Sequence, residues 1–162
     1  MIKTIALSIV VLLAALLIYA ATKPDSFRIE RTAAIKAPPE KIFALIDDFH
    51  QWESWSPWET RDPALKRTYS GAASGKGAVY EWNGNKDIGQ GRMEIVESSP
   101  SSKILLNLDF VTPFEAHNVV EFSLSADGDS TTVTQAMYGP SPYISKLMMI
   151  FFQHGKDSWR QV

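Results

Sequence analysis

The chain has 162 residues, a formal net charge of −2 and no cysteine. This length suits a single folded domain with one hydrophobic core, and the charge provides no basic field for binding nucleic acid. The lack of cysteine excludes disulfides, thiolate catalysis and cysteine-ligated zinc, so stability must come from packing.

The amino-terminal segment is the most apolar stretch of the chain. Residues 4–21 carry no charge and are flanked by Lys3 and Lys23. At about 1.5 Å per residue, a helix of this length just crosses a hydrocarbon core of roughly 30 Å, which predicts a transmembrane helix. A cleaved signal peptide is the alternative, but cleavage after Ala20 or Ala21 would place a large residue where a small one is preferred.

These features divide the chain into a membrane anchor, residues 1–23, and a folded domain, residues 24–162. Because Lys3 and Lys23 lie on opposite sides of the apolar segment, the positive-inside rule hardly distinguishes between the two membrane orientations. We expect a single-pass membrane protein with its amino end inside and its folded domain on the extracytoplasmic side, because short N-terminal anchors normally export the domain attached to them.

Residues 27–36 alternate as a first strand, with Ile29, Ala33 and Ile35 on one face. Arg31 falls on this same apolar face. Its guanidinium can reach solvent at a sheet edge or pair with a neighbouring acid, and alternatively it can anchor a ligand.

A helix is predicted to begin at Pro39 and to end at Pro57. An apolar stripe with helical spacing runs along it. The stripe consists of Ile42, Leu45, Ile46, Phe49, Trp52, Trp55 and Trp58. Three indoles supply more apolar surface than a short helix needs for anchoring, so we expect them to contribute to a cavity wall; the alternative is that all three belong to the core.

Strand periodicity recurs over residues 66–71, 77–83, 91–97, 103–111, 117–126 and 131–139. Short connections with turn residues, such as Gly84-Asn85 and Asp127-Gly128, predict an antiparallel meander. Residues 143–159 are apolar over a wide arc and predict a final helix that starts near Ser141-Pro142.

This order of elements predicts an α+β fold, in which a curved antiparallel seven-stranded sheet wraps around the C-terminal helix. The apolar alternation assigns the following residues to the inner face: Tyr80, Trp82, Met93, Ile95, Leu106, Leu108, Phe110, Val120, Phe122, Leu124, Val133 and Met137. A sheet curved in this way does not always fill its own interior, and the remaining volume is a candidate ligand site.

The domain resembles the START-like helix-grip superfamily (SRPBCC), in its polyketide cyclase/dehydrase branch. The resemblance rests on the order and spacing of short motifs that span almost everything after the anchor. These motifs are Ala37-Pro38 with Ile42-Phe43, Leu45 to Asp48, Trp52, Trp55 to Trp58, Tyr80 and Trp82 with Gly84-Asn85, Gly89 and Gly91 before Met93, Phe110 with Pro113-Phe114, and Thr131 with Val133 and Gly139.

The resemblance implies a hydrophobic cavity that binds lipids, sterols, polyketides or other apolar molecules, and it does not imply catalysis. We expect no cofactor, and the scattered histidines and the lack of cysteine predict no metal site. The expected ligand-binding residues are Trp55, Trp58, Tyr80, Trp82, Met93, Phe110, Phe122, Gln135, Met137 and Phe151.

Two features depart from the family pattern. Similar sequences often carry tryptophan at the position of Gln135, an inward polar residue that can bind a ligand head group, a water or neighbouring backbone. Relatives also have a longer closing helix after the glycine that corresponds to Gly155.

Catalytic motifs are scarce. The glycines around Lys76 lack the spacing of a phosphate-binding loop, and His50, His117 and His154 lack the partners of a metal site. Asp47 and Asp48 are neighbours that do not share a helix face.

Three functions remain open from the sequence. The first is a membrane-tethered module that binds an apolar small molecule or lipid, and the oligomeric state is left open. The second is a cyclase or hydratase that uses Glu53, Arg31 or Gln135 as its polar group. The third is a docking module that binds a partner through an open sheet rim or its last helix.

Overall fold

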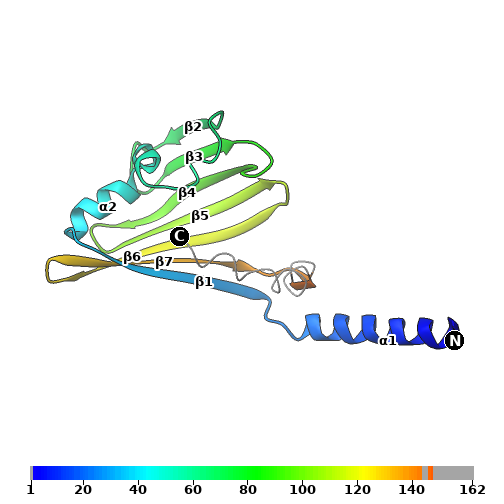
Figure 1. The fold of residues 1–162 in the computed structure, drawn as a ribbon. Coiled ribbons are helices and arrows are strands. Elements are labelled where there is room, and N and C mark those ends of the chain that lie inside the picture. The colour runs from blue at the N-terminus through cyan, green and yellow to red at the C-terminus, as the bar shows by residue number, and fades with distance from the viewer. Residues whose placement is uncertain (1, 144–145, 148–162) are drawn as a thin grey trace. The chain divides into compact units, whose positions relative to one another are not determined.

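The computed structural model of the chain describes residues 2–143 and 146–147 (Figure 1). The chain forms two compact units, Met1–Phe27 with Pro140–Val162, and Arg28–Gly139. The division into an anchor, residues 1–23, and a domain, residues 24–162, stays a prediction.

The first unit contains the predicted N-terminal helix, α1 (Ile2–Ala21). The Tyr143 hydroxyl donates a hydrogen bond of 2.7 Å to the carbonyl of Leu17, and the Ser141 amide donates one of 2.7 Å to the carbonyl of Asp25. Within residues 2–143 and 146–147, no helix combines the length and the apolar character that a bilayer crossing requires. The predicted transmembrane crossing is therefore not shown.

Helical structure is also present at Tyr143, next to the predicted start of the final helix. The amide of Lys146 donates a hydrogen bond of 3.1 Å to the carbonyl of Pro142. Most of the predicted helix over residues 143–159 lies outside the described residues.

The predicted antiparallel seven-stranded sheet is confirmed, in the order β1-β7-β6-β5-β4-β3-β2 (Figure 1). Consecutive strands from β2 to β7 pair as neighbours, and β1 closes the order beside β7. The strands are β1 (Ser26–Ile35), β2 (Lys66–Gly71), β3 (Ala78–Asn83), β4 (Gln90–Ser99), β5 (Lys103–Thr112), β6 (Ala116–Asp127) and β7 (Ser130–Pro140).

The predicted helix from Pro39 to Pro57 is wrong in its extent. The α-helix α2 (Pro39–Asp47) ends early, and a 3₁₀ helix, η1 (Phe49–Ser54), follows it. The break lies at Asp48, whose backbone is extended and whose carboxylate accepts a hydrogen bond of 2.9 Å from the amide of His50. An aspartate that caps the next helix competes with continuation of the first one, and periodicity alone does not detect this competition.

The inner face of the sheet carries the core, as the alternation predicts. Phe49 and Trp52 from η1 pack on it together with Ile42 and Ile46 from α2. Most of the predicted inner residues are buried, and Phe110, Val133 and Met137 are partly buried against them. The segment from α2 to η1 therefore covers part of the sheet with aromatic side chains.

Leu106 and Leu105 offer a matched test of the two sheet faces. Leu106 is fully buried on the inner face, whereas its neighbour Leu105 in β5 is only partly buried. We expect Leu106→Ala to lower the free energy of unfolding by about 2–5 kcal/mol, because it leaves a cavity in a packed core. Leu105→Ala should cost clearly less in urea unfolding followed by tryptophan fluorescence. Equal losses from the two variants would show that the inner face is not the principal core.

Candidate functional site

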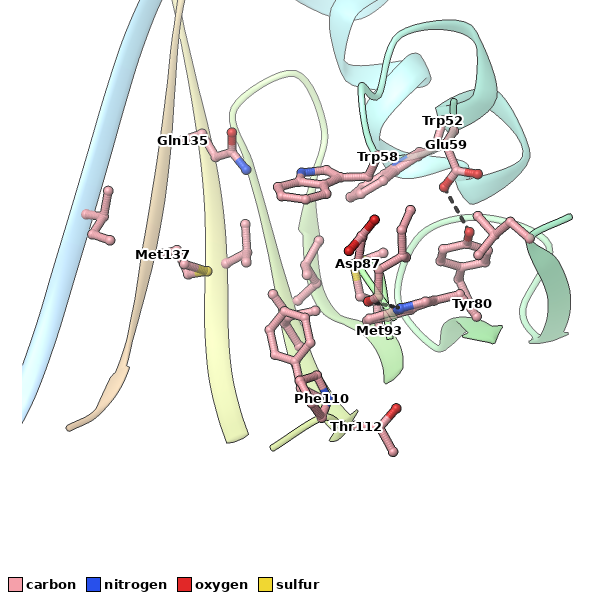
Figure 2. A pocket seen from close by; sticks show the side chains of 18 of the residues that line it. Trp52, Trp58, Glu59, Tyr80, Asp87, Met93, Phe110, Thr112, Gln135 and Met137 are labelled. Carbon is pink, nitrogen blue, oxygen red and sulfur yellow. Dashed lines mark hydrogen bonds between the residues drawn. The ribbon is translucent and has the colours of Figure 1, made fainter. Parts of the chain in front are cut away.

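A pocket of about 590 Å³ lies in the unit Arg28–Gly139, against the inner face of the sheet (Figure 2). This volume is in the usual range of small-molecule sites, roughly 300–1,000 Å³. Figure 2 shows Gln135 and Met137 on one side of the pocket and Glu59 and Tyr80 on the other, with Trp58 between them. Most of the wall is apolar or aromatic.

Most of the side chains predicted to bind a ligand line this pocket. They are Trp58, Tyr80, Trp82, Met93, Phe110, Gln135 and Met137. Trp58 contributes to the wall although it is 56% exposed, and the guanidinium of Arg61 stacks over its ring at 4.4 Å. The structure thus brings these residues together, and their contact with a ligand stays a prediction.

Trp55 and Phe122 do not line the pocket. The indole N–H groups of Trp55 and Trp52 donate hydrogen bonds of 3.0 Å to the carbonyls of Leu45 and Ile46, respectively. These carbonyls belong to the last turn of α2, where backbone carbonyls have no hydrogen-bond donor within their own helix. Phe122 is buried edge-on against both indoles, with ring centroids 6.3 Å apart in each pair. Phe151 lies outside the described residues.

Several wall residues were not among the predicted ligand contacts. Leu106, Leu108 and Val120 had been assigned to the inner face, and the alternation of the first strand indicated Ile29 and Arg31. Trp52, which lies in η1, was one of the three indoles expected at a cavity wall, and Thr112 ends β5. The others come from loops, where a period of two gives no signal. The additional wall residues are Ile29, Arg31, Trp52, Glu59, Leu65, Asp87, Ile88, Leu106, Leu108, Thr112, Pro113 and Val120.

Gly91 makes room for two of the aromatic wall residues. It lies between Trp82 of β3 and Phe110 of β5 in the strand register, and these rings meet edge to face at 5.8 Å. A Cβ atom at Gly91 would come within 2.3 Å of the Trp82 ring and 2.5 Å of the Asp109 carbonyl oxygen. Glycine is therefore required here for close packing.

The turn between β3 and β4 forms another part of the wall. The buried carboxylate of Asp62 accepts hydrogen bonds of 2.9 Å and 2.7 Å from the amides of Ala64 and Asn85. The Trp82 indole donates a bond of 3.4 Å to the carbonyl of Ile88 in the same turn. These bonds fix Ile88 and its neighbour Asp87 at the pocket.

Glu59 is a buried acid on the pocket wall. Its carboxylate accepts a hydrogen bond of 2.8 Å from the Tyr80 hydroxyl and one of 2.7 Å from Nε of Arg67 (Figure 2). Arg67 also donates to the backbone carbonyl of Glu59 and forms an ion pair of 3.0 Å with Glu53. A buried charge of this kind needs such partners, and both carboxylate oxygens of Glu59 have one.

This network is suited to holding the wall in place. Burial, together with the hydrogen bond to Glu59, raises the pKa of Tyr80 far above its ordinary value. The phenol therefore stays protonated at neutral pH and donates to Glu59. Glu53, one of the predicted catalytic groups, lies outside the pocket wall with its side chain 57% exposed.

Among the described residues, the other acids and histidines considered in the sequence do not line the pocket; they are Asp47, Asp48, His50 and His117. Asp47 accepts a hydrogen bond of 2.6 Å from the hydroxyl of Ser98, and Asp48 caps η1. His117 contacts Asp109, with 2.7 Å between Nδ1 and Oδ1. His154 lies outside the described residues.

Tyr80 and Tyr69 provide a matched pair for testing the Glu59 network. Tyr80→Phe removes a donor to a buried carboxylate, so we expect it to lower the free energy of unfolding by about 1–3 kcal/mol. Tyr69 stacks on Tyr80, and its hydroxyl forms no hydrogen bond with any described residue. Tyr69→Phe should therefore cost less in the same chemical unfolding experiment. A Tyr80→Phe variant as stable as the parent chain would show that Glu59 does not depend on this hydrogen bond.

Solved structures with this fold come from distant proteins. Ginseng major latex-like protein 151 from Panax ginseng is 13% identical, with a TM-score of 0.54 and coverage of 81% of this chain and 98% of that chain. Protein MLL2253 from Mesorhizobium loti is 19% identical, with a TM-score of 0.54 and coverage of 80% and 87%. Aha1 from Colwellia psychrerythraea, solved as a dimer, is 18% identical, with a TM-score of 0.52 and coverage of 81% and 94%. At these identities the likeness establishes the fold alone.

No curated protein matches the chain in sequence. The family model described as "Polyketide cyclase / dehydrase and lipid transport" matches residues 26–152, which is most of the chain and includes every residue of the pocket wall. The chain therefore belongs to the polyketide cyclase/dehydrase and lipid transport family.

Proposed function

We propose that the chain binds a hydrophobic small molecule or lipid in the pocket of the unit Arg28–Gly139, and that α1 attaches the chain to a membrane. Membership of the family implies binding of hydrophobic ligands. The observation that carries the proposal is the pocket of about 590 Å³ with its mainly apolar and aromatic wall.

The chemistry of the wall favours binding driven by apolar contact. Burying some 300 Å² of apolar ligand surface is worth on the order of 7 kcal/mol before the costs of association. The few polar groups on the wall would orient the ligand, as in most small-molecule sites. Glu59 is engaged by Arg67 and Tyr80, so the site supports binding better than proton transfer.

A substitution that fills the pocket tests the binding proposal. Met137 lines the pocket, whereas Thr132 lies on the same strand, faces the opposite side of the sheet and does not line it. We expect Met137→Trp to weaken binding of the neutral dye phenylnaphthylamine by about tenfold or more, because the indole occupies ligand volume. Dye fluorescence is measured on the full-length chain, with Thr132→Trp as the control.

Thr132→Trp should bind the dye as tightly as the parent chain. Native mass spectrometry of the purified chain adds an independent readout, since a retained apolar molecule would appear as a mass adduct. A parent chain that neither takes up the dye nor carries an adduct would contradict the proposal.

The membrane part of the proposal rests on α1. Large apolar side chains are exposed along this helix, and Leu7, Leu12 and Ile18 are 65%, 69% and 67% exposed. Contiguous exposed apolar surface of this kind is typical of sites that contact a membrane or another protein. We keep the orientation expected from the sequence, with the residues after α1 on the extracytoplasmic side.

A charge placed in α1 tests this attachment. If the helix lies within a bilayer, Leu12→Arg should cost about 2.5–3.5 kcal/mol and reduce co-flotation of the full-length chain with phosphatidylcholine vesicles. Asn107→Arg adds the same charge at an exposed position of β5 and should leave flotation unchanged. A parent chain that stays with the soluble fraction would refute membrane attachment without affecting the pocket proposal.

A further inference from the structure

Arg31 is a cation on the wall of an otherwise mainly apolar pocket. We propose that the ligand is an amphiphile with a carboxylate head group, bound by Arg31 and Gln135, and that its apolar tail lies against the aromatic part of the wall. This inference rests on the proposed binding function and specifies the chemical class of the ligand.

The strand register brings Arg31 and Gln135 together. On the outer face of the β1–β7 pair, the hydroxyls of Thr32 and Thr134 are 3.1 Å apart, and the Arg28 guanidinium stacks over the Tyr138 ring at 5.1 Å. Both contacts fit one antiparallel register. The same register places Arg31 opposite Gln135, with both side chains on the face that lines the pocket.

The Arg31 guanidinium has unused hydrogen-bonding capacity. Its single hydrogen bond within the described part of the chain is 3.0 Å long and runs to the carbonyl of Glu30, its neighbour in sequence. No described carboxylate lies within 4.0 Å of it. By contrast, Arg28 on the outer face pairs with Glu30 and Glu121.

The other charged residues of the wall do not compete for this role. The carboxylate of Glu59 forms an ion pair of 2.7 Å with Arg67 and accepts a hydrogen bond from Tyr80. Arg67 and Tyr80 belong to β2 and β3, on that side of the pocket. Asp87 lies in the turn between β3 and β4, separated from β7 by β4, β5 and β6 in the order of the sheet. The Arg31 side therefore favours an anionic group, and the opposite side provides mainly apolar and aromatic contacts beside Glu59 and Asp87.

The geometry of the donors favours a carboxylate. A guanidinium presents parallel N–H groups that match the two oxygens of a carboxylate, and the amide of Gln135 can add another N–H donor. Phe122, opposite Gln135 in the β6–β7 register, is buried, so this part of the site is backed by core packing. Arg31 and Gln135 are themselves exposed, so such a contact gains strength as the bound ligand excludes water from it.

Decanoate and decanol test the head group, since they share a chain length and differ in charge. Each is titrated into the full-length chain, and binding is followed by the emission of the tryptophans that line the pocket. We expect the parent chain to bind decanoate more tightly than decanol by about tenfold or more, as expected for hydrogen bonds to a charged group. Arg31→Gln should abolish this preference and leave decanol binding unchanged.

Two further variants complete the experiment. Arg31→Lys should retain part of the preference, because it keeps the charge but loses the paired donors. Arg28→Gln removes a cation from the outer face of the same strand and should change neither affinity. An unchanged preference in Arg31→Gln, or equal binding of decanoate and decanol by the parent chain, would overturn the inference while leaving the binding function intact. Failure of the parent chain to bind either ligand would overturn both.

Discussion

The pocket depends on which donors form hydrogen bonds with the backbone carbonyls at the C-terminal end of α2. The last carbonyls of a helix need external donors, and here the indole N–H groups of Trp52 and Trp55 supply two of them. These bonds hold η1 against the end of α2, and Phe122 packs edge-on against both indoles. Trp58 and Glu59, which come a few residues later in the chain, are thereby brought to the pocket wall.

Close packing shapes another part of the wall. Gly91 allows Trp82 and Phe110 to meet across β4, and Asp62 fixes the turn that carries Ile88. Both features restrict the conformations of aromatic and apolar side chains that line the pocket. In a pre-formed wall, fewer side chains lose conformational entropy when a ligand binds. This suits a site whose affinity comes mainly from apolar contact.

The polar groups on the wall divide into two kinds. Glu59 is surrounded by donors from Arg67 and Tyr80, as a buried carboxylate requires, and this arrangement stabilises the protein itself. Arg31 and Gln135 instead line the pocket from β1 and β7, and the Arg31 guanidinium keeps donors available to a ligand. The contrast explains why the two charged regions of one pocket are expected to have different roles.

The sequence alone determined the architecture, because alternation and turn residues are local signals. The strand over residues 66–71 has the predicted bounds, and the inner-face residues of the other strands were assigned correctly from a period of two. The tertiary structure decided which of these residues meet at the pocket. Trp55 has the spacing of a wall residue, yet its indole turns to the carbonyl of Leu45, and Glu59 reaches the wall through a loop that has no periodicity. Such outcomes depend on which distant group satisfies a polar atom, and that information is absent from local sequence pattern.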